Sequence, residues 1–202
     1  IMTLDQKRWL LLLVSCIINL FAGSIYAWSV FASPLAERIG SLLQTSLTSA
    51  DLAIAFSIAN ALGPIPMIFG GLINDRFGPK FVIAAGGISM GFGLYASGNA
   101  ESVSELIVFY GLFFGTGLSL VYGCTINNTL KFFPDHRGLV GGLATAAYGI
   151  SSVLVPPIAT QLISVYGITN ALEIMGVFIG VLSSSAVFFN ALSSRLHAFD
   201  GC

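Results

Sequence analysis

A ten-residue stretch, Gly71-Leu-Ile-Asn-Asp75-Arg76-Phe-Gly78-Pro-Lys80, separates two long apolar runs and carries one acid and two bases. In a membrane protein, such an interruption is a tight loop between two spanning helices. We expect Gly78 to supply a turn conformation that a side chain would resist, and Gly71 to let a helix end pack closely against a neighbour. Asp75 is expected to pair with a base or with a helix N-terminus. Arg76 and Lys80 indicate the cytoplasmic side, where bases accumulate.

The composition on both sides of this loop places the chain in a bilayer. Of its 202 residues, 55% are hydrophobic and only 8% are charged, and the mean hydropathy is +0.90. A soluble domain carries about 25% charged residues, so this chain could not cover a surface that faces water. The sequence therefore predicts an all-α integral membrane protein with the lipid bilayer as its surroundings. It contains no basic stripe that would indicate a nucleic-acid partner.

Apolar runs of near-spanning length predict six transmembrane helices, because about 20 residues cross a bilayer. Their expected ranges are 9–31, 51–73, 81–97, 105–130, 137–165 and 171–192. Pro64 and Pro66 should kink the second helix. A signal peptide is disfavoured because its apolar region would be about 7–15 residues long.

Glycine pairs four residues apart predict close contacts between helices, since small residues let membrane helices approach one another. The pairs are Gly87 with Gly91, Gly111 with Gly115, and Gly138 with Gly142.

The distribution of bases predicts the topology. If the N-terminus is inside, Arg38 is the one base outside, and the inside segments hold Lys7, Arg8, Arg76, Lys80, Lys131, Arg137 and Arg195. Bases favour the cytoplasmic side of a membrane. With an even number of helices, we expect both termini in the cytoplasm.

The apolar runs carry no charged residue or histidine near their centres, where a charge costs about 2.5–3.5 kcal/mol on insertion scales. This argues against a proton relay of carboxylates within the chain and against a metal site in the membrane. The three cysteines show no metal-ligand spacing, and no nucleophile–base pair of a catalytic kind appears in the sequence. We therefore expect neither an enzyme nor a bound metal or cofactor.

Uncharged polar and aromatic residues inside the runs remain as candidates to line a path for a solute. They are Tyr26, Trp28, Asn60, Tyr122 and Tyr148. For each aromatic residue the alternative is simple packing, because Tyr and Trp also favour membrane boundaries. The amide of Asn60 should face protein or water, since lipid would leave its donors unpaired.

Two segments carry a family resemblance. The pattern G-x-x-x-D-R-x-G-x-K from Gly71 to Lys80 resembles the signature loop between helices 2 and 3 of the major facilitator superfamily, which acts there as a cytoplasmic latch. The segment from Val121-Tyr122-Gly123 through Lys131-Phe-Phe-Pro-Asp-His-Arg137-Gly-Leu resembles the helix 4–5 region of the oxalate/formate antiporter family within that superfamily, where a Tyr-Gly pair leads to such a loop. Tyr26-Ala-Trp is also similar to that family. Phe132 and His136 stand where tryptophan and lysine are usual.

The resemblance implies the N-terminal half of a twelve-helix transporter, built as two inverted three-helix repeats, with the substrate between the halves. It implies that Tyr26, Tyr122 and Tyr148 line an anion pocket, and that Asn60 is a polar pocket residue. The implied latch consists of Gly71, Asp75, Arg76, Gly78 and Lys80, with Arg137.

The implied function is secondary active transport, by alternating access, of a small carboxylate anion such as oxalate, formate, lactate or pyruvate. A proton or counter-anion would be coupled to it, a complementary C-terminal half would be the partner, and the location would be the plasma (inner) membrane. Ile25 stands where glutamine can precede the helix 1 tyrosine, so the choice of carboxylate stays open. The alternatives are a stand-alone six-helix binding or regulatory module, and a facilitator for a different small solute.

Overall fold

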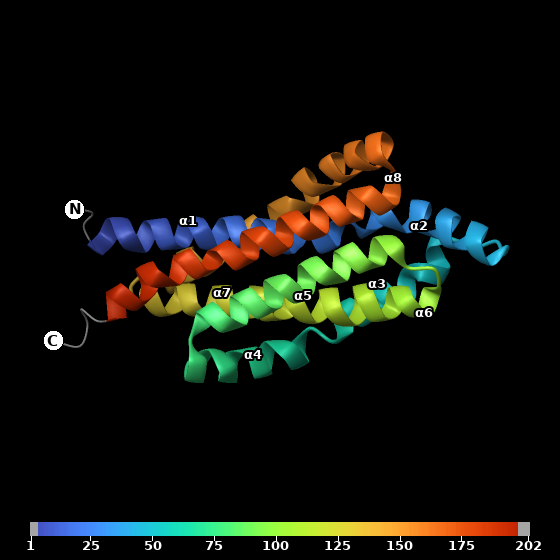
Figure 1. Cartoon of the computed structure of the whole chain (residues 1–202). Coiled ribbons are helices and arrows are strands. Elements are labelled where there is room, and N and C mark those ends of the chain that lie inside the picture. The colour runs from blue at the N-terminus through green and yellow to red at the C-terminus, as the bar shows by residue number, and fades with distance from the viewer. Residues whose placement is uncertain (1–3, 198–202) are drawn as a thin grey trace.

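The computed structural model describes residues 4–197, and within them all regular structure is helical. Long helices run back and forth along one axis, and the described chain begins and ends at the same end of the bundle (Figure 1). Five stretches are long and apolar enough to span a membrane, and the last of these, Arg137–Ser183, reverses direction at Gly167. The predicted all-α membrane bundle is therefore confirmed for the described residues, with six crossings.

The first crossing consists of α1 (Leu4–Ala22), a 3-10 segment η1 (Gly23–Ala27) and α2 (Trp28–Leu43). It continues well beyond residue 31, where we expected it to end. Pro34 lies inside α2 without stopping it, because a proline removes only one backbone hydrogen bond. The helix ends at Gln44, whose left-handed backbone lets its N–H bond the carbonyl of Gly40.

The second crossing is broken at the predicted prolines. Helix α3 (Ser49–Ala61) begins with a capping box between Thr48 and Asp51, and α4 (Pro64–Phe77) starts directly at a proline. Proline suits the first position of a helix because its missing N–H would have no partner there. The two prolines thus mark a break between helices rather than a kink in a helix that runs from 51 to 73.

The third and fourth crossings pack side by side. The third is α5 (Pro79–Asn99). The fourth runs through α6 (Val103–Leu106), the π-helix η2 (Ile107–Phe114) and α7 (Gly115–Phe132). Both extend a few residues past the expected 81–97 and 105–130, because the helices continue into the polar ends of the apolar runs.

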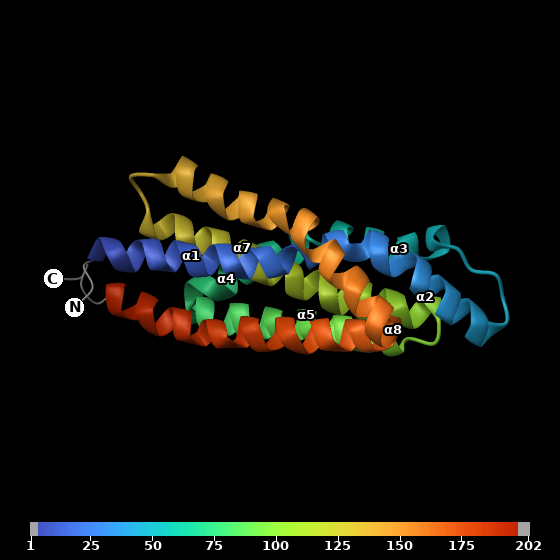
Figure 2. The same ribbon diagram turned by 90° about the horizontal axis from the view of Figure 1, so that it is seen from above.

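The last two crossings form α8 (Arg137–His197), which contains both predicted helices. Gly167 has φ 79° and ψ 167°, a backbone conformation that glycine adopts readily and other residues avoid. Figure 2 shows the chain turning there and running back along α5. The expected gap from 165 to 171 is therefore reduced to a single glycine.

The glycine contacts differ in part from the expectation. A side chain at Gly91 would meet the backbone of Gly176 and Gly180 in α8, whereas at Gly138 and Gly142 it would meet no atom within 4 Å. The pair that contains Gly91 therefore packs α5 against α8, whereas the pair of Gly138 and Gly142 makes no close contact in this structure.

Gly71 also lies open, so the close packing that we expected there is wrong. The neighbouring Gly70 makes the close approach instead, against Leu120 of α7.

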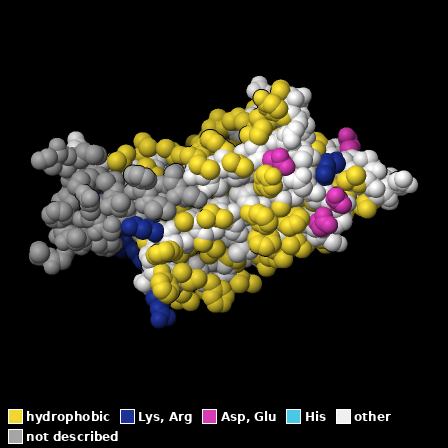
Figure 3. All heavy atoms as spheres, viewed as in Figure 1, with side chains coloured by type: hydrophobic (Ala, Val, Ile, Leu, Met, Phe, Trp, Pro, Cys, Tyr) yellow, Lys and Arg dark blue, Asp and Glu magenta, His cyan; other side chains and the backbone are white. Residues whose placement is uncertain are grey.

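Charges gather at the two ends of the bundle, with apolar side chains between them (Figure 3). We call one end the basic end, because its described segments carry Arg8, Arg76, Lys80, Lys131 and Arg137. The opposite, acidic end carries Arg38 together with Glu37, Asp51, Glu101, Glu105 and Glu173. The loops after α4 and α7 lie at the basic end, and the turn at Gly167 lies at the acidic end (Figure 1).

Candidate functional site

Three predicted site residues come together from three crossings. The ring centroid of Tyr148 in α8 lies 5.4 Å from that of Tyr26 in η1 and 4.6 Å from that of Tyr122 in α7. We call these residues the tyrosine cluster. Tyr26 is 43% exposed and the other two are half-buried. None of their hydroxyl groups forms a hydrogen bond with another described residue, so all three phenols remain available as donors.

The tyrosine cluster lies about halfway along the membrane-spanning helices. Tyr122 and Tyr148 lie ten and eleven residues from the helix ends that flank the α7–α8 loop. At 1.5 Å per residue this is about 15 Å, or half of a hydrocarbon core of about 30 Å. The cluster can therefore donate hydrogen bonds near the centre of the membrane.

Local backbone packing sets the position of Tyr26. It belongs to η1, where a side chain at Gly23 would collide with Ser151 and with the backbone of Tyr148. Only glycine lets this turn of the first crossing lie directly against α8. The close approach brings Tyr26 and Tyr148 into edge-to-face contact.

Two predicted site residues lie outside the cluster. Trp28 is 8% exposed and packs between Phe56 of α3 and Tyr110 of η2, with centroid distances of 5.9 and 4.6 Å. Asn60 donates to the carbonyl of Phe56 at 2.8 Å, within its own helix. Trp28 therefore makes the packing contacts that were the alternative to lining a path. Asn60 makes a hydrogen bond to the backbone of its own helix.

The predicted latch residues lie at the basic end. Asp75 forms an ion pair with Lys131 at 2.7 Å, so its partner is a base from the end of α7. Gly78 has φ 82°, as its expected turn requires. Arg76 lies over the ring of Phe77. A polar hollow of about 380 Å³ is lined by Gly71, Asp75, Lys131 and Arg137. Lys80 is not among the residues that line it.

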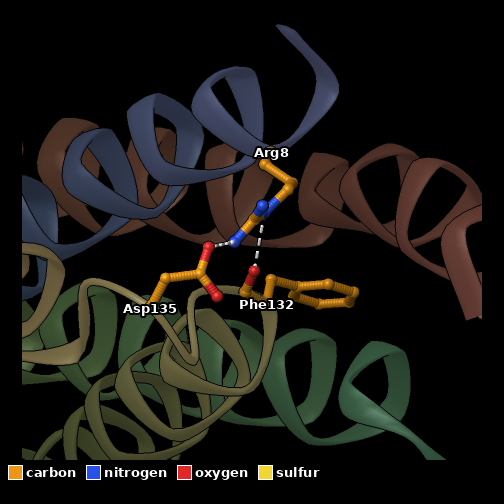
Figure 4. A network of polar contacts seen from close by, with 3 residues as sticks. All are labelled: Arg8, Phe132 and Asp135. Carbon is orange, nitrogen blue, oxygen red and sulfur yellow. Dashed lines mark hydrogen bonds and ion pairs between the residues drawn. The ribbon is translucent and has the colours of Figure 1, made fainter. Parts of the chain in front are cut away.

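Sequence reasoning missed a second contact at this end, centred on Arg8 (Figure 4). Its guanidinium donates to the carbonyl of Phe132 at 2.8 Å and pairs with Asp135 at 3.2 Å. It also lies 4.7 Å from the centroid of the Phe133 ring. These contacts tie the start of α1 to the α7–α8 loop. The two charges were visible in the sequence, but their meeting depends on α1 lying beside α7.

Comparison with known proteins places the chain in a family. Residues 10–197 match the sequence profile of the Major Facilitator Superfamily. The chain belongs to the major facilitator superfamily. The membership expected from the two loop motifs is therefore confirmed.

Relatives within the superfamily are similar in sequence to this chain over more than half of its length. It is 30% identical to the oxalate:formate antiporter of Oxalobacter formigenes over 177 residues, which cover 87% of this chain and 41% of that protein. It is 28% identical to the uncharacterized MFS-type transporter YhjX of Escherichia coli over 85% of this chain and 41% of that protein. Monocarboxylate transporter 11 of Mus musculus is 31% identical over 61% of this chain and 27% of that protein. The chain thus spans about two fifths of the length of the first two.

The expected role of Asp75 as a latch leads to a testable prediction. We expect Asp75→Asn to slow transport up to about fivefold while substrate affinity changes little. The ion pair with Lys131 is largely exposed, and such pairs contribute at most about 1 kcal/mol, which shifts the balance of inward- and outward-open states by that factor. Uptake rates and binding titrations of reconstituted protein measure the two effects separately.

A double-mutant cycle controls for other effects of the Asp75 change. Lys131→Gln should slow transport to the same extent, and the double variant should be no slower than either single variant. Additive losses, or a loss of binding alone, would contradict a latch formed by this pair.

Proposed function

We propose that this chain is the N-terminal half of a secondary active transporter that carries small carboxylate anions by alternating access. The single observation that carries the proposal is the tyrosine cluster, which brings three uncommitted phenol donors from three crossings to mid-membrane depth. A carboxylate has about four lone-pair sites, so it can accept from all three phenols at once. The names of the relatives, an oxalate:formate antiporter and a monocarboxylate transporter, support this class of substrate.

The tyrosine cluster carries no positive charge that could balance the charge of a bound anion. Desolvating a carboxylate costs several kcal/mol unless an opposite charge compensates for it, and neutral donors are about half as strong as charge-assisted ones. Within the chain, every Lys and Arg falls at or beyond the ends of the apolar runs. We therefore propose that a complementary half provides the balancing cation.

The unequal burial of the crossings supports a partner half. In the most apolar windows of Ser49–Phe77 and Arg137–Ser183, 17% and 28% of residues are buried, whereas the other three stretches reach 56–61%. In the apolar windows of these two stretches, most residues thus stay unburied after the described bundle has packed. A second bundle that rocks against them would cover part of that surface in each state.

The transported anion also needs a driving partner. No acid lies mid-span in this sequence, so a carboxylate relay for protons is not available in this half. We propose that a counter-anion at the same cluster, or a proton handled by the complementary half, drives transport. Exchange would require only that both anions fit the three phenols.

We propose that the basic end faces the cytoplasm of the plasma (inner) membrane and that both termini lie on that side. The prediction rests on the accumulation of Lys and Arg at that end and is measured by thiol labelling in intact cells. Gly138→Cys, in the exposed start of α8, should react with an impermeant maleimide only after permeabilisation. Ser46→Cys, equally exposed in the α2–α3 loop, should react at once. The reverse pattern would overturn the orientation. Cys202, the natural probe of the C-terminus, lies outside the described residues.

Counterflow of labelled oxalate, formate, lactate and pyruvate into liposomes tests the proposed function. With the full-length protein, we expect Tyr148→Phe to weaken apparent affinity for the transported carboxylate about tenfold or more. A hydrogen bond to a charged group contributes about 1.5–3 kcal/mol, and 1.4 kcal/mol is a factor of ten.

Tyr95→Phe is the matched control, because Tyr95 is as exposed as Tyr26 but belongs to α5, away from the cluster. It should leave counterflow unchanged. Equal losses in the two variants would contradict the site, and the absence of counterflow with all four carboxylates would contradict the substrate class.

A further inference from the structure

A second cavity lies between the end of α1, η1 and the two halves of α8. Its volume is about 330 Å³, and it is lined by Ser24, by residues of the first half of α8 such as Val155 and Ile158, and by Met175 and Phe178 of the second half. Among the described residues, every one that lines it except Ser24 is apolar. The cavity lies toward the acidic end, because its α8 residues flank the turn at Gly167.

Ser24 is the unusual member of this lining. It is 1% exposed, and its hydroxyl has no hydrogen-bond partner. Two buried serines of other helices each bond a carbonyl one turn earlier, Ser97 to Gly93 at 2.6 Å in α5 and Ser119 to Gly115 at 2.8 Å in α7. A buried hydroxyl without a partner is unfavourable. Ser24 therefore lacks a partner that an occupant of the cavity can provide.

The cavity selects an occupant by its size and chemistry. An apolar cavity of about 150 Å³ stays dry and binds benzene, and a buried water needs two to four polar partners. This cavity is about twice as large and offers one polar group, so it favours an apolar body with a single oxygen over water. Ile158 and Phe178 are more than half exposed, so the cavity opens sideways onto the hydrocarbon of the bilayer.

We propose that this cavity binds an uncharged, membrane-dissolved amphiphile whose alkyl chain fills the apolar lining and whose hydroxyl or carbonyl oxygen accepts a hydrogen bond from Ser24. Charged carboxylates are excluded because none of the described residues that line the cavity is a base. The site is therefore chemically distinct from the tyrosine cluster, although the two share a structural element.

Occupancy of the cavity should act on the tyrosine cluster through η1. Ser24 and Tyr26 lie in the same five-residue segment, and Gly23 of that segment packs directly against α8. An occupant would hold η1 against both halves of α8, and so would oppose any shift of these elements during alternating access. This consequence rests on the proposed function, and it predicts inhibition that added carboxylate does not relieve.

Photolabelling tests the binding itself, without any transport. The purified protein in lipid nanodiscs is irradiated with an eight-carbon alkanol that carries a diazirine, and the labelled residues are mapped by mass spectrometry. We expect labelling of cavity residues, Met175 and Phe178 among them, that unmodified 1-octanol displaces. Labelling that is not displaced, or that falls equally on Val153 and Val165 outside the cavity, would show general contact with lipid and overturn the proposal.

Variants identify the role of each part of the cavity. Ser24→Ala should weaken displaceable labelling several-fold, because it removes the one hydrogen-bond donor in the described lining. Ile158→Trp should abolish it by filling the cavity from its open side. Val153→Trp is the matched control, since Val153 is an exposed residue of the same half of α8 that does not line the cavity; it should leave labelling unchanged.

A separate counterflow measurement with 1-octanol tests the coupling to transport. The expected result is a lower maximal rate with an unchanged half-saturating carboxylate concentration, and loss of this inhibition in Ile158→Trp. Displaceable labelling in a protein that transports no carboxylate would sustain the cavity and refute the transport proposal. Carboxylate transport without displaceable labelling would support the transport proposal and refute the proposed cavity site.

Discussion

Saturable carboxylate counterflow is expected to be absent from liposomes that hold residues 1–202 alone, and to appear when a complementary six-helix half is co-expressed. The polar groups that the chain places at mid-membrane depth, the three phenols among them, are all neutral, and a desolvated carboxylate needs a positive partner. It also leaves Ser49–Phe77 and Arg137–Ser183 mostly uncovered, so it has no second body against which to rock.

The measurement compares the lone chain, the co-expressed pair and empty liposomes at equal protein and lipid. The complementary half should be one that carries a Lys or Arg inside its helices. A variant of that half with the base changed to Gln separates the need for charge from the need for a second bundle. If the lone chain supports saturable uptake equal to that of the pair, the proposed division of labour between halves is wrong.

Gly91→Val is expected to lower the free energy of unfolding by about 1–3 kcal/mol or more, the usual cost of overpacking. An added side chain there would lie 2.6 Å from the carbonyl oxygen of Gly176 and 2.8 Å from the Cα of Gly180. Both are backbone atoms, which cannot turn away as a flexible side chain can. Helices α5 and α8 would have to separate along their shared length.

Thermal unfolding of the detergent-solubilised protein measures this effect. Gly142→Ala is the control: it is also a helical glycine of a four-residue pair, but an added side chain there meets nothing within 4 Å. Alanine is favoured over glycine in a helix by up to about 1 kcal/mol, so this variant should unfold at the same or a higher temperature. A Gly91 variant as stable as the control would show that α5 and α8 are not in close contact.

Hydropathy and the placement of bases in the sequence were enough to predict the membrane bundle. Long apolar runs must become helices in lipid, because each backbone group then finds its partner within the same segment. The turn at Gly78 was also predictable, because glycine readily adopts the positive φ that this turn requires. The reversal at Gly167 falls between the two apolar runs that were expected to end at 165 and to begin at 171. Two short motifs, around Asp75 and around Asp135, were sufficient for the superfamily.

The tertiary structure decided which of the candidate residues share a site. The sequence treated Tyr26 and Trp28 alike, but two residues of separation rotate a side chain by about 200° on an α-helix and by about 240° on a 3-10 helix such as η1. One therefore joins Tyr122 and Tyr148, and the other is buried against Phe56. Likewise, helix rotation gives the close contact to Gly70 rather than Gly71.

The contacts between distant segments were equally out of reach of the sequence. Arg8 and Asp135 meet, and Ser24 faces an apolar cavity, because α1 lies against α7 and α8 in this bundle. Periodicity and composition report which residues prefer lipid, water or one another in general. They do not report which face of one helix meets which face of another, because that depends on the packing of the whole bundle.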